Sequence, residues 1–575
     1  MKFRWQIAPA QPLLANKLAT ELKISNLLAQ CLLNRGHSEP EAIGLFLQPL
    51  LKNLADPLLL PNIAAAVDRL FLARERAEPL VIFGDYDVDG VTSTALLTES
   101  LRSLGWQVNH YLPHRLDEGY GLSLDGVDNC LQKFPTTLLL AVDCGSTAVE
   151  SIAWLKQRGV DVIVLDHHQV SNPPPAALAL VNPQLSCAVH PTSNFRELCS
   201  VGLAFKLVHA LLKHGRNLAL PGFAEFDLRP FLDLVALGTI ADLVPLSGEN
   251  RILVFAGLER LRRTTRPGLI ALKEVAGISS ALGPVEVGFQ LAPRLNAAGR
   301  LEDASEALSL LMAPNLGAAI PLAQSLDLRN RERQKIERGI ADEAIGALKA
   351  RFNAETDFVI VEGQLLWHVG VVGIVASRVL QQFHRPTIIV GGDNGEWRGS
   401  GRSIAGFDLA AALRECSDLL LRHGGHAMAA GLSLKSDNLE LLRSRLNDLA
   451  KRLLKPEDLQ PCLRLDADIP LADLNTRSFD QLARLQPLGQ GNPPVHFVAR
   501  NLTQSRPLQR LGADKQHVKL WVTDGKATHE AVWWGAGQHA ALPVGRFDLA
   551  FAPFLNTYNN RTTLQLKVLD WQPSA

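Results

Sequence analysis

The 575-residue chain has no excess of charge of either sign. Lys and Arg together number 58, as do Asp and Glu, so the formal net charge is zero. This balance argues against a protein that holds nucleic acid by bulk charge, although it leaves room for a local basic groove. Hydrophobic residues make up 47% of the chain and charged residues 20%. That composition is typical of a globular protein and excludes a disordered, collagenous or fibrous one.

Cysteine motifs and long apolar runs are also missing. The seven cysteines are scattered and none forms a CxxC pair, so neither a disulfide framework nor a cysteine zinc site is predicted. No uninterrupted apolar run reaches the roughly 18 residues of a membrane span. Residues 1–12 lack a continuous apolar core, so we expect no signal peptide. These absences predict a reduced, cytoplasmic protein without a membrane partner.

The length and the apolar pattern indicate several domains, about three to four at roughly 150 residues each. From about Pro79, short apolar runs alternate with amphipathic segments, which predicts a parallel sheet covered on both faces. A second α/β pattern begins near residue 353. After about Pro456, short alternating segments indicate an all-β barrel or sandwich. Between the two α/β patterns, an Arg-rich stretch over 323–352 predicts one long helix with a solvated face.

Acidic residues follow three of the predicted strands. The first strand is followed by an acidic loop over 85–89, the second by Asp143, and the third by Asp166-His167-His168. The carboxyl ends of parallel strands meet at one edge of a sheet, so we expect these groups to converge. Their mutual repulsion is costly unless cations offset it. Carboxylates with one or two imidazoles suit Mn²⁺ or Mg²⁺ better than zinc or copper.

Each cluster has a simpler interpretation when taken alone. Asp143 could be a turn residue before Gly145, and a lone His pair is usually structural. The loop that begins at Asp85 starts like an EF-hand calcium loop, but its twelfth position is Leu96 instead of Glu, and a strand enters it. The conjunction of three such strand ends favours a metal centre.

Together these motifs resemble the DHH phosphoesterase superfamily. The 166–168 triplet, the 87–89 loop and Asp143 match its ordered motifs, and residues 233–246 are similar to its last metal-ligand motif. Residues 293–300, 367–378 and 424–431 resemble the linker and substrate-binding segments of its single-strand-specific exonucleases. The resemblance covers nearly the whole chain.

The resemblance implies an α/β fold in which a parallel-sheet DHH domain is joined by a long helix to a smaller α/β DHH-associated domain, followed by a C-terminal OB-fold β-barrel. The expected divisions are an N-terminal helical extension at 1–50, the DHH catalytic domain at 51–315, the connecting helix at 316–352, the DHH-associated substrate-binding domain at 353–455, and the OB-fold nucleic-acid-binding domain at 456–575.

For the metal centre, the resemblance implies two divalent cations, Mn²⁺ or Mg²⁺. Asp87 would bind the first metal, Asp89 the second, and Asp143 both. His167 and Asp242 would complete the second site. His168 would contact the scissile phosphate, while Asp85, Asp166 and Asp233 would orient ligands, and Asp233 stays open as an alternative to Asp242. Phe83 occupies the position at which small-molecule members of the superfamily carry a histidine. The first metal site is therefore expected to have fewer protein ligands. Ser93 and Thr94 are expected to cap a helix and not to act as nucleophiles.

A DNA-binding groove is predicted from segments near the second α/β pattern. Residues 396–403 place two Arg beside small residues, a composition that can bind phosphate but in isolation is usually an ordinary loop. With the resemblance, the predicted DNA contacts are Arg294, Asn296, Arg300, Ser377, Arg378, Arg398, Ser400, Gly401, Arg402, Ser403, Gly425 and His426.

The C-terminal segment adds Lys519 and Trp521, which are two residues apart on a predicted strand and so share a face on which a base could stack. Trp533 and Trp534 are adjacent, so one of them should lie in the core.

The resemblance implies a metal-dependent exodeoxyribonuclease that degrades single-stranded DNA from the 5′ end to mononucleotides by two-metal-ion hydrolysis. Such an enzyme would act as a monomer in DNA repair, mismatch repair and recombination, beside a helicase and a single-strand-binding protein. One alternative is a phosphodiesterase for short oligoribonucleotides or cyclic dinucleotides. The C-terminal region argues against it, because such relatives generally lack the barrel. Another is a non-catalytic DNA-binding replication factor, which the complete set of metal ligands disfavours.

Overall fold

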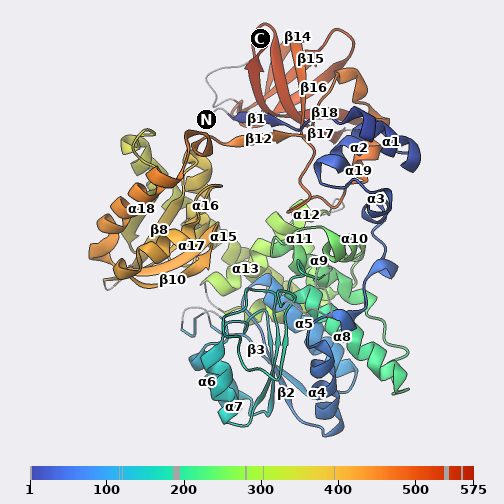
Figure 1. The fold of residues 1–575 in the computed structure, drawn as a ribbon, viewed down its shortest axis with the longest axis vertical. Coiled ribbons are helices and arrows are strands. Elements are labelled where there is room, and N and C mark those ends of the chain that lie inside the picture. The colour runs from blue at the N-terminus through green and yellow to red at the C-terminus, as the bar shows by residue number, and fades with distance from the viewer. Residues whose placement is uncertain are drawn as a thin grey trace.

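The computed structural model describes residues 3–114, 117–119, 121–185, 195–278, 282–301, 303–393, 395–536, 543–558 and 561–574. Within these ranges no helix is both long and apolar enough to span a bilayer. The elements form three units, each built on its own sheet, with the parallel-sheet unit at the bottom of Figure 1 and the C-terminal unit at the top.

The first unit is a five-stranded parallel sheet in the order β3-β2-β4-β5-β6. Its strands are β2 (Leu80–Phe83), β3 (Val108–Tyr111), β4 (Leu138–Val142), β5 (Asp161–Leu165) and β6 (Ala179–Val181). Every residue of β2 and β4 is buried, because helices cover both faces of the sheet. The strand order reverses between β2 and β4, and ligands bind beyond the carboxyl ends of strands at such a point.

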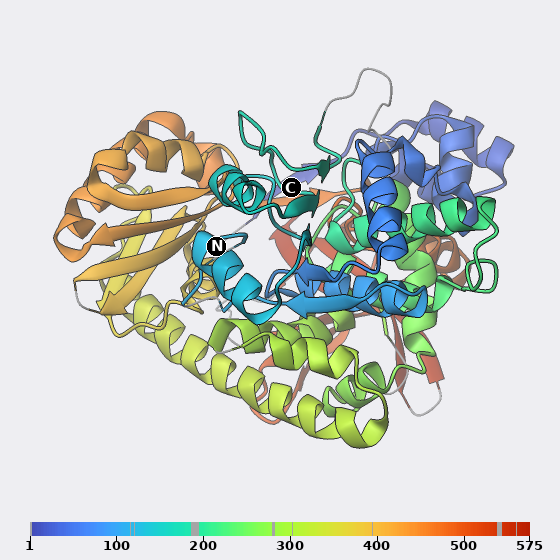
Figure 2. The same ribbon diagram turned by 90° about the horizontal axis from the view of Figure 1, so that it is seen from below.

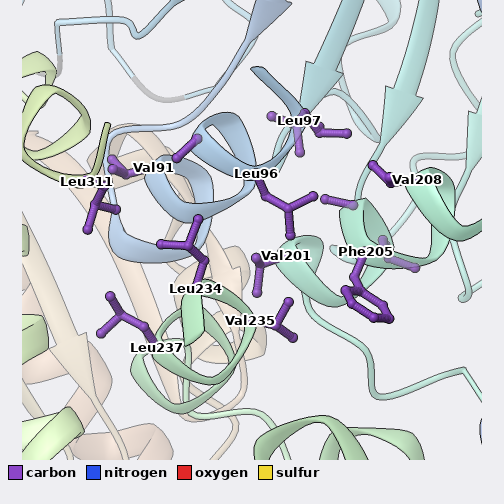
Figure 3. Packing of buried hydrophobic residues seen from close by; sticks show 14 of the residues in the cluster. Val91, Leu96, Leu97, Val201, Phe205, Val208, Leu234, Val235, Leu237 and Leu311 are labelled. Atoms are coloured by element: carbon purple, nitrogen blue, oxygen red, sulfur yellow. The ribbon is translucent and has the colours of Figure 1, made fainter. Parts of the chain in front are cut away.

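Alternate residues of each strand enter two separate cores. On one face, Ile82 and Leu140 pack with residues of α4 (Ile63–Glu75), α5 (Val88–Ser103) and α8 (Ser200–Asn217). On the other face, Phe83 and Leu139 pack with α6 (Leu124–Lys133) and α7 (Val149–Gln157). Figure 3 shows side chains of α5, α8 and α9 (Leu232–Ala241) meeting in the larger core. This packing fixes the strand ends that carry the acidic residues.

Further helices extend the larger core away from the sheet. They are α10 (Gly248–Arg262), α11 (Pro267–Val275), α12 (Pro284–Glu286), a π-helix over Val287–Leu291, α13 (Ala292–Leu301) and α14 (Ser305–Leu311).

The long helix predicted from the Arg-rich stretch is α15 (Leu316–Arg351). Its 36 residues span roughly 54 Å at 1.5 Å per residue, and Figure 2 shows it running from the first unit to the second sheet. The expectation of a solvated Arg face is wrong for part of it. Arg333 is buried with Glu337, one turn further along, because α13 and α16 (Val372–Phe383) pack against the helix.

The second sheet has the order β10-β11-β9-β8-β7. Its strands are β7 (Ile360–Leu365), β8 (Thr387–Asp393), β9 (Glu396–Arg402), β10 (Leu420–His426) and β11 (Ala429–Lys435). Helix α16 packs on one face with α15, and α17 (Leu409–Glu415) and α18 (Leu439–Leu453) pack on the other. Within this sheet β7 and β8 pair in parallel, and the other described pairs of neighbouring strands are antiparallel.

The third sheet comprises β13 (Ala467–Asp468), β14 (Phe497–Leu511), β15 (His517–Thr523), β16 (Thr528–Trp533), β17 (Phe547–Tyr558) and β18 (Arg561–Pro573). Pairings run β14-β15-β16-β18-β17 and return from β17 to β14. With the two α/β units this arrangement confirms the predicted fold class.

The N-terminal segment packs on this C-terminal unit. Strand β1 (Arg4–Ile7) pairs in parallel with β12 (Cys462–Leu465). Helices α1 (Pro12–Leu22), α2 (Asn26–Asn34) and α3 (Pro40–Leu47) share one hydrophobic core with β14, β15 and β17, as does α19 (Thr476–Ala483). The N-terminal helices α1 to α3 therefore complete the core of the last domain along the chain.

Candidate metal centre and nucleic-acid cleft

Asp87 caps the helix that begins where β2 ends. Its Oδ1 accepts the backbone N–H groups of Asp89 at 2.9 Å and Gly90 at 3.1 Å, two of the donors that a helix start leaves unpaired. The prediction that Ser93 and Thr94 cap this helix is wrong, because it begins at Val88 and both residues lie inside it. Gly90 is required here, since a Cβ would lie 2.6 Å from the carbonyl oxygen of Asp85.

Asp89 and Asp143 are both held by the start of helix α8. The oxygens of Asp89 accept the backbone N–H groups of Ser200 at 2.7 Å and Val201 at 2.8 Å, where the helix dipole favours a negative charge. The Ser200 hydroxyl donates to Asp143 Oδ1 at 2.8 Å. Sequence reasoning missed Ser200, because no spacing links a serine to carboxylates 111 and 57 residues away.

The predicted ligands of the second metal converge on one atom of His167. Its Nε2 lies 3.9 Å from Asp89 Oδ2, 3.6 Å from Asp143 Oδ1 and 3.5 Å from Asp242 Oδ2. Asp85, Asp87 and Asp143 form a neighbouring group whose oxygens lie within 4.8 Å of one another. Asp143 thus belongs to this group and also lies beside His167 of the other, which is the arrangement expected of a carboxylate that bridges two ions.

The electrostatics of the cluster fit bound cations. Burial and the neighbouring carboxylates raise the pKa of Asp143 well above its usual range, that of Asp242 to about 9 and that of Asp89 to about 6. Burial, with His168 beside it, lowers the pKa of His167 to about 4, so its imidazole is neutral, the form that binds metals. Within the described part of the chain, the buried atoms His167 Nε2 and Asp242 Oδ2 have no hydrogen-bond partner. A divalent cation would satisfy both.

His168, unlike His167, carries a positive charge. Asp166 Oδ1 accepts the backbone N–H of His167 at 2.8 Å and lies 2.8 Å from His168 Nδ1. Burial works to lower the pKa of His168, but the bond to Asp166 outweighs it and raises that pKa to about 9. Burial works to raise the pKa of Asp166, and the same bond outweighs it and holds that pKa far below its usual range. His168 is therefore a cation at neutral pH, beside the metal ligands.

Two residues near the motif positions lie away from the cluster. Asp233 accepts the Thr264 hydroxyl at 2.7 Å and lies 3.7 Å from Arg266 Nε. It precedes Asp242 by nine residues along α9, roughly 13 Å at 1.5 Å per residue, so of the two acids it is Asp242 that lies beside His167. Phe83 is fully buried and stacks on Tyr111, with ring centroids 5.4 Å apart, so this position adds no ligand to the first site.

A cleft joins the metal cluster to the second sheet. A cavity of about 200 Å³ is lined by Asp85 and Asp87 of the first unit, by Asn296 and Arg300 of α13, and by Ser400 and Arg402 of β9. Its walls are fixed in place. Asn296 accepts the backbone N–H of Val88 at 3.2 Å, Arg300 donates to the carbonyl of Gly370 at 3.2 Å, and Arg402 donates to Ser400 Oγ at 2.9 Å.

Strand β9 decides which residues of the 396–403 segment face the cleft. Alternate residues of a strand face opposite sides, so Arg398, Ser400 and Arg402 share one face. Arg398 and Ser400 also line a wider adjoining cavity of about 700 Å³. Gly401 faces the core, where a Cβ would lie 2.5 Å from Leu409. Ser403 is buried and donates to the carbonyl of Phe407 at 2.7 Å. The Ser403 hydroxyl is therefore already bonded within the protein and Gly401 lies on the face away from the cleft, while DNA contact at these two positions stays a prediction.

Two predicted arginines form ion pairs with carboxylates of the long helix, and each carboxylate is shared with a second arginine, Arg331 or Arg333. Arg294 pairs with Asp327 at 2.9 Å, and Arg378 pairs with Glu337 at 2.5 Å. Nearby, the hydroxyl of Ser377 donates to the carbonyl of Gly373 at 3.2 Å. A guanidinium that is already paired within the protein binds a phosphate less strongly. The pair of Arg294 holds α13 against α15, and the pair of Arg378 holds α16 against α15.

The remaining predicted contacts lie at exposed strands. Gly425 and His426 are on β10, which is exposed along almost its whole length. Lys519 and Trp521 share the outer face of β15, as predicted, but Lys519 pairs with Glu530 at 2.8 Å, so the face is mixed in charge. Trp533 is buried and Trp534 is 52% exposed, which confirms that one of the two lies in the core.

Comparison with known proteins gives three family matches in chain order. The DHH family N-terminal domain matches residues 79–239, the DHHA1 domain 334–452 and the RecJ OB domain 465–570. The single-stranded-DNA-specific exonuclease RecJ of Bacillus subtilis is 38% identical over 574 residues, covering 99% of this chain and 71% of that protein. The Escherichia coli protein of the same name is 36% identical, with 88% and 89% covered.

Among solved structures, RecJ from Thermus thermophilus in complex with Mn²⁺ aligns with a TM-score of 0.85 and 31% identity, over 100% of this chain and 80% of that one. A Mg²⁺ complex of the same protein aligns with a TM-score of 0.78 and 29% identity, over 100% and 79%.

Proposed function

This chain belongs to the RecJ family, and we propose that it hydrolyses single-stranded DNA from the 5′ end and releases mononucleotides with two divalent cations. The observation that carries the proposal is the position of Asp143, which is shared between the Asp85–Asp87 group and the Asp89–His167–Asp242 group. Two ions that share one carboxylate are close enough to act on the same phosphodiester.

Each ligand residue has a role in this proposal. Asp87 and Asp85 hold the first ion, Asp89, His167 and Asp242 hold the second, and Asp143 holds both. Bound Mn²⁺ or Mg²⁺ would lower the pKa of a water molecule and neutralise charge on the phosphate.

The surrounding residues orient the ligands and the substrate. Ser200 fixes two carboxylates by hydrogen bonds, and Asp166 fixes the ring of His168. The His168 cation faces the scissile phosphate. Arg300 and Arg402, held rigidly across the cleft, bind the phosphate next to it, since a charge-assisted hydrogen bond is about twice as strong as a neutral one.

The route of the substrate follows from the cleft walls. Asn296, Ser400 and Arg398 extend the contact surface beyond the two arginines. The wall is lined from both α/β units, which are joined by α15, and the C-terminal unit supplies the outer face of β15 for further bases. We therefore propose the division 51–315, 353–455 and 456–575 with the connecting helix 316–352, and assign residues 1–50 to the last of these units.

The proposed setting is the cytoplasm, where the chain acts as a monomer in DNA repair and recombination. A helicase and a single-strand-binding protein would supply its substrate.

The test uses single-stranded oligonucleotides labelled at either end, with a duplex control, in Mn²⁺, in Mg²⁺ and in EDTA. We expect metal-dependent release of mononucleotides from the 5′ end of single strands only. Release from the 3′ end would overturn the proposed polarity. Binding without cleavage in either metal would favour the non-catalytic alternative.

A further inference from the structure

An exposed apolar surface begins at the residue that follows the proposed metal ligand Asp242 in the chain. Leu243 follows the ligand Asp242 in the chain and is 70% exposed, while Val285 is 61% and Phe289 79% exposed. These three residues, which we call the Phe289 patch, line a cavity of about 120 Å³ together with residues of a loop before β14. None of the described residues that line it carries a charge.

The backbone is in unusual conformations at two of these positions. Leu243 has φ of 62°, in the left-handed region that non-glycine residues avoid. Phe289 lies on the π-helix Val287–Leu291, a rare conformation that occurs frequently at functional sites. In both cases the result is an apolar side chain turned toward solvent. Leu243 directly follows the C-cap Asp242 of α9, where a left-handed residue is common, so the feature that needs an explanation is the exposure of neighbouring large apolar side chains.

The patch lies between the C-terminal unit and the metal cluster. On one side its cavity is lined by Leu488, Gly489 and Gln490, and Leu246 donates its backbone N–H to the carbonyl of Gln490 at 2.7 Å. On the other side the π-helix continues directly into α13, which carries two residues of the catalytic cleft. Figure 1 shows α12, next to the π-helix, between the C-terminal unit and α13. A single strand that reaches the metals from the C-terminal unit passes this surface.

We propose that the Phe289 patch is a nucleobase-binding surface, on which a base of the incoming single strand stacks against Phe289 and contacts Leu243 and Val285. The inference rests on the proposed function. An uncharged apolar surface on the path of a polyanion is suited to bases and not to phosphates. Unpaired bases expose their faces for stacking, whereas a duplex keeps them stacked inside. The patch therefore contributes to the selection of single strands.

The test is the Phe289→Ala variant. It should fold normally, because the side chain that it removes is largely exposed. The control is Leu453→Ala, on α18 and 56% exposed, which removes apolar surface far along the chain from the patch. Binding is measured in EDTA to oligothymidylate and to matched strands in which one nucleotide at a time is abasic. We expect Phe289→Ala to weaken binding of the intact strand about tenfold, the usual size of one base–aromatic contact, and Leu453→Ala to leave it unchanged.

The abasic strands identify what Phe289 contacts. At one position, removal of the base should weaken wild-type binding and have no further effect on Phe289→Ala. Phe289→Trp should restore affinity, and its fluorescence should be quenched by the strand. Wild-type affinity in Phe289→Ala would overturn the proposal and assign the surface to another occupant. An equal loss by the variant on every abasic strand would also overturn it, because the lost contact would not be to a base.

Hydrolysis of bis(p-nitrophenyl) phosphate separates this proposal from the proposed function. That ester has no nucleobase and needs only the metal cluster, so wild type and Phe289→Ala should cleave it equally. A wild-type protein that cleaves neither the ester nor the strand would contradict the proposed function, while the binding measurements would still decide the role of the patch. Loss of ester hydrolysis in Phe289→Ala would place the residue in the catalytic machinery and overturn the base-binding role.

Discussion

Ser200 donates its hydroxyl to Asp143 Oδ1 at 2.8 Å, and its backbone N–H reaches Asp89 Oδ2 at 2.7 Å. One residue at the start of α8 therefore orients both the shared carboxylate and a ligand of the second ion. Such supporting contacts fix ligand geometry before the metal arrives.

Replacing Ser200 by Ala should weaken metal binding without unfolding the protein. Loss of an outer hydrogen bond of this kind costs about 10- to 100-fold in metal affinity or activity, and Mn²⁺ titration followed by activity measures it. Ser93→Ala is the matched control, since Ser93 is also buried and its hydroxyl has no partner among the described residues. Equal Mn²⁺ affinity in both variants would show that Ser200 does not position the ligands.

Asp143→Ala should abolish cleavage, because it removes a ligand from both ions at once. We expect a loss of at least about 10³-fold in Mn²⁺, comparable to removing a major electrostatic contribution to a transition state. Asp143→Asn, which keeps the shape but not the charge, should be similarly inactive, and circular dichroism checks the fold. Retention of most of the wild-type rate by either folded variant would remove Asp143 from its role.

Arg402→Ala should weaken binding of single strands and reduce its salt dependence. Removing one phosphate contact lowers the slope of log K against log salt by about 0.7 for a single strand. Arg445→Ala provides the control, since Arg445, on α18, pairs with Asp418 and lines neither cavity of the cleft. An unchanged slope for Arg402→Ala would show that this guanidinium does not contact a phosphate.

The metal-free protein should become less stable as the pH rises. Asp242, with its pKa raised to about 9, and Asp89, with its pKa raised to about 6, bind protons more tightly when folded than when unfolded. The folded state holds more protons, so stability falls from about pH 4, the ordinary carboxyl pKa, up to about pH 9.

Bound Mn²⁺ should offset this loss of folding stability at high pH. The rise in melting temperature on adding Mn²⁺ should therefore grow with pH. Asp242→Asn serves as the comparison, because an amide does not titrate and its melting temperature in EDTA should vary less. A melting temperature in EDTA that does not change across this range would contradict the charge states assigned to the cluster.

Deleting the C-terminal unit should be tolerated only if the N-terminal helices are deleted with it. Leu18, Leu28 and Leu32 are buried against that unit, and each would lose about 1.5–3 kcal/mol of burial. A chain of residues 1–455 should therefore aggregate, whereas residues 51–455 should stay soluble and hydrolyse bis(p-nitrophenyl) phosphate. A soluble, cooperatively melting 1–455 chain would show that the helices fold without their partner.

Local patterns predicted the elements that position the catalytic carboxylates. The run Leu80–Phe83 is the strand β2, because a parallel strand buried on both faces is continuously apolar. The Arg-rich stretch forms most of α15, since a long polar segment with little Gly or Pro favours a helix. The grouping of Asp143 with His167 also followed, because the ends of parallel strands share an edge.

Contacts between distant segments could not be predicted in this way. Arg294 and Arg378 looked available for DNA, yet both pair with carboxylates of α15. Their partners are distinguishable only when helices pack, since the sequence does not show which Asp or Glu of a helix will be buried beside an arginine.

The sequence by itself determined the chemistry of this protein. The acids at three strand ends and the His pair leave few uses besides holding divalent cations, and the ordered motifs place the chain in one superfamily. Tertiary structure decided which of those groups lie close enough to share an ion, that Ser200 is hydrogen-bonded to two of them, and that the N-terminal helices complete the C-terminal core. It also decided that Phe289 and Leu243 face solvent. The reason is physical. Residue type and the local spacing of apolar residues set the helix or strand propensity of a segment, whereas distances and burial depend on which surfaces of the whole chain pack together.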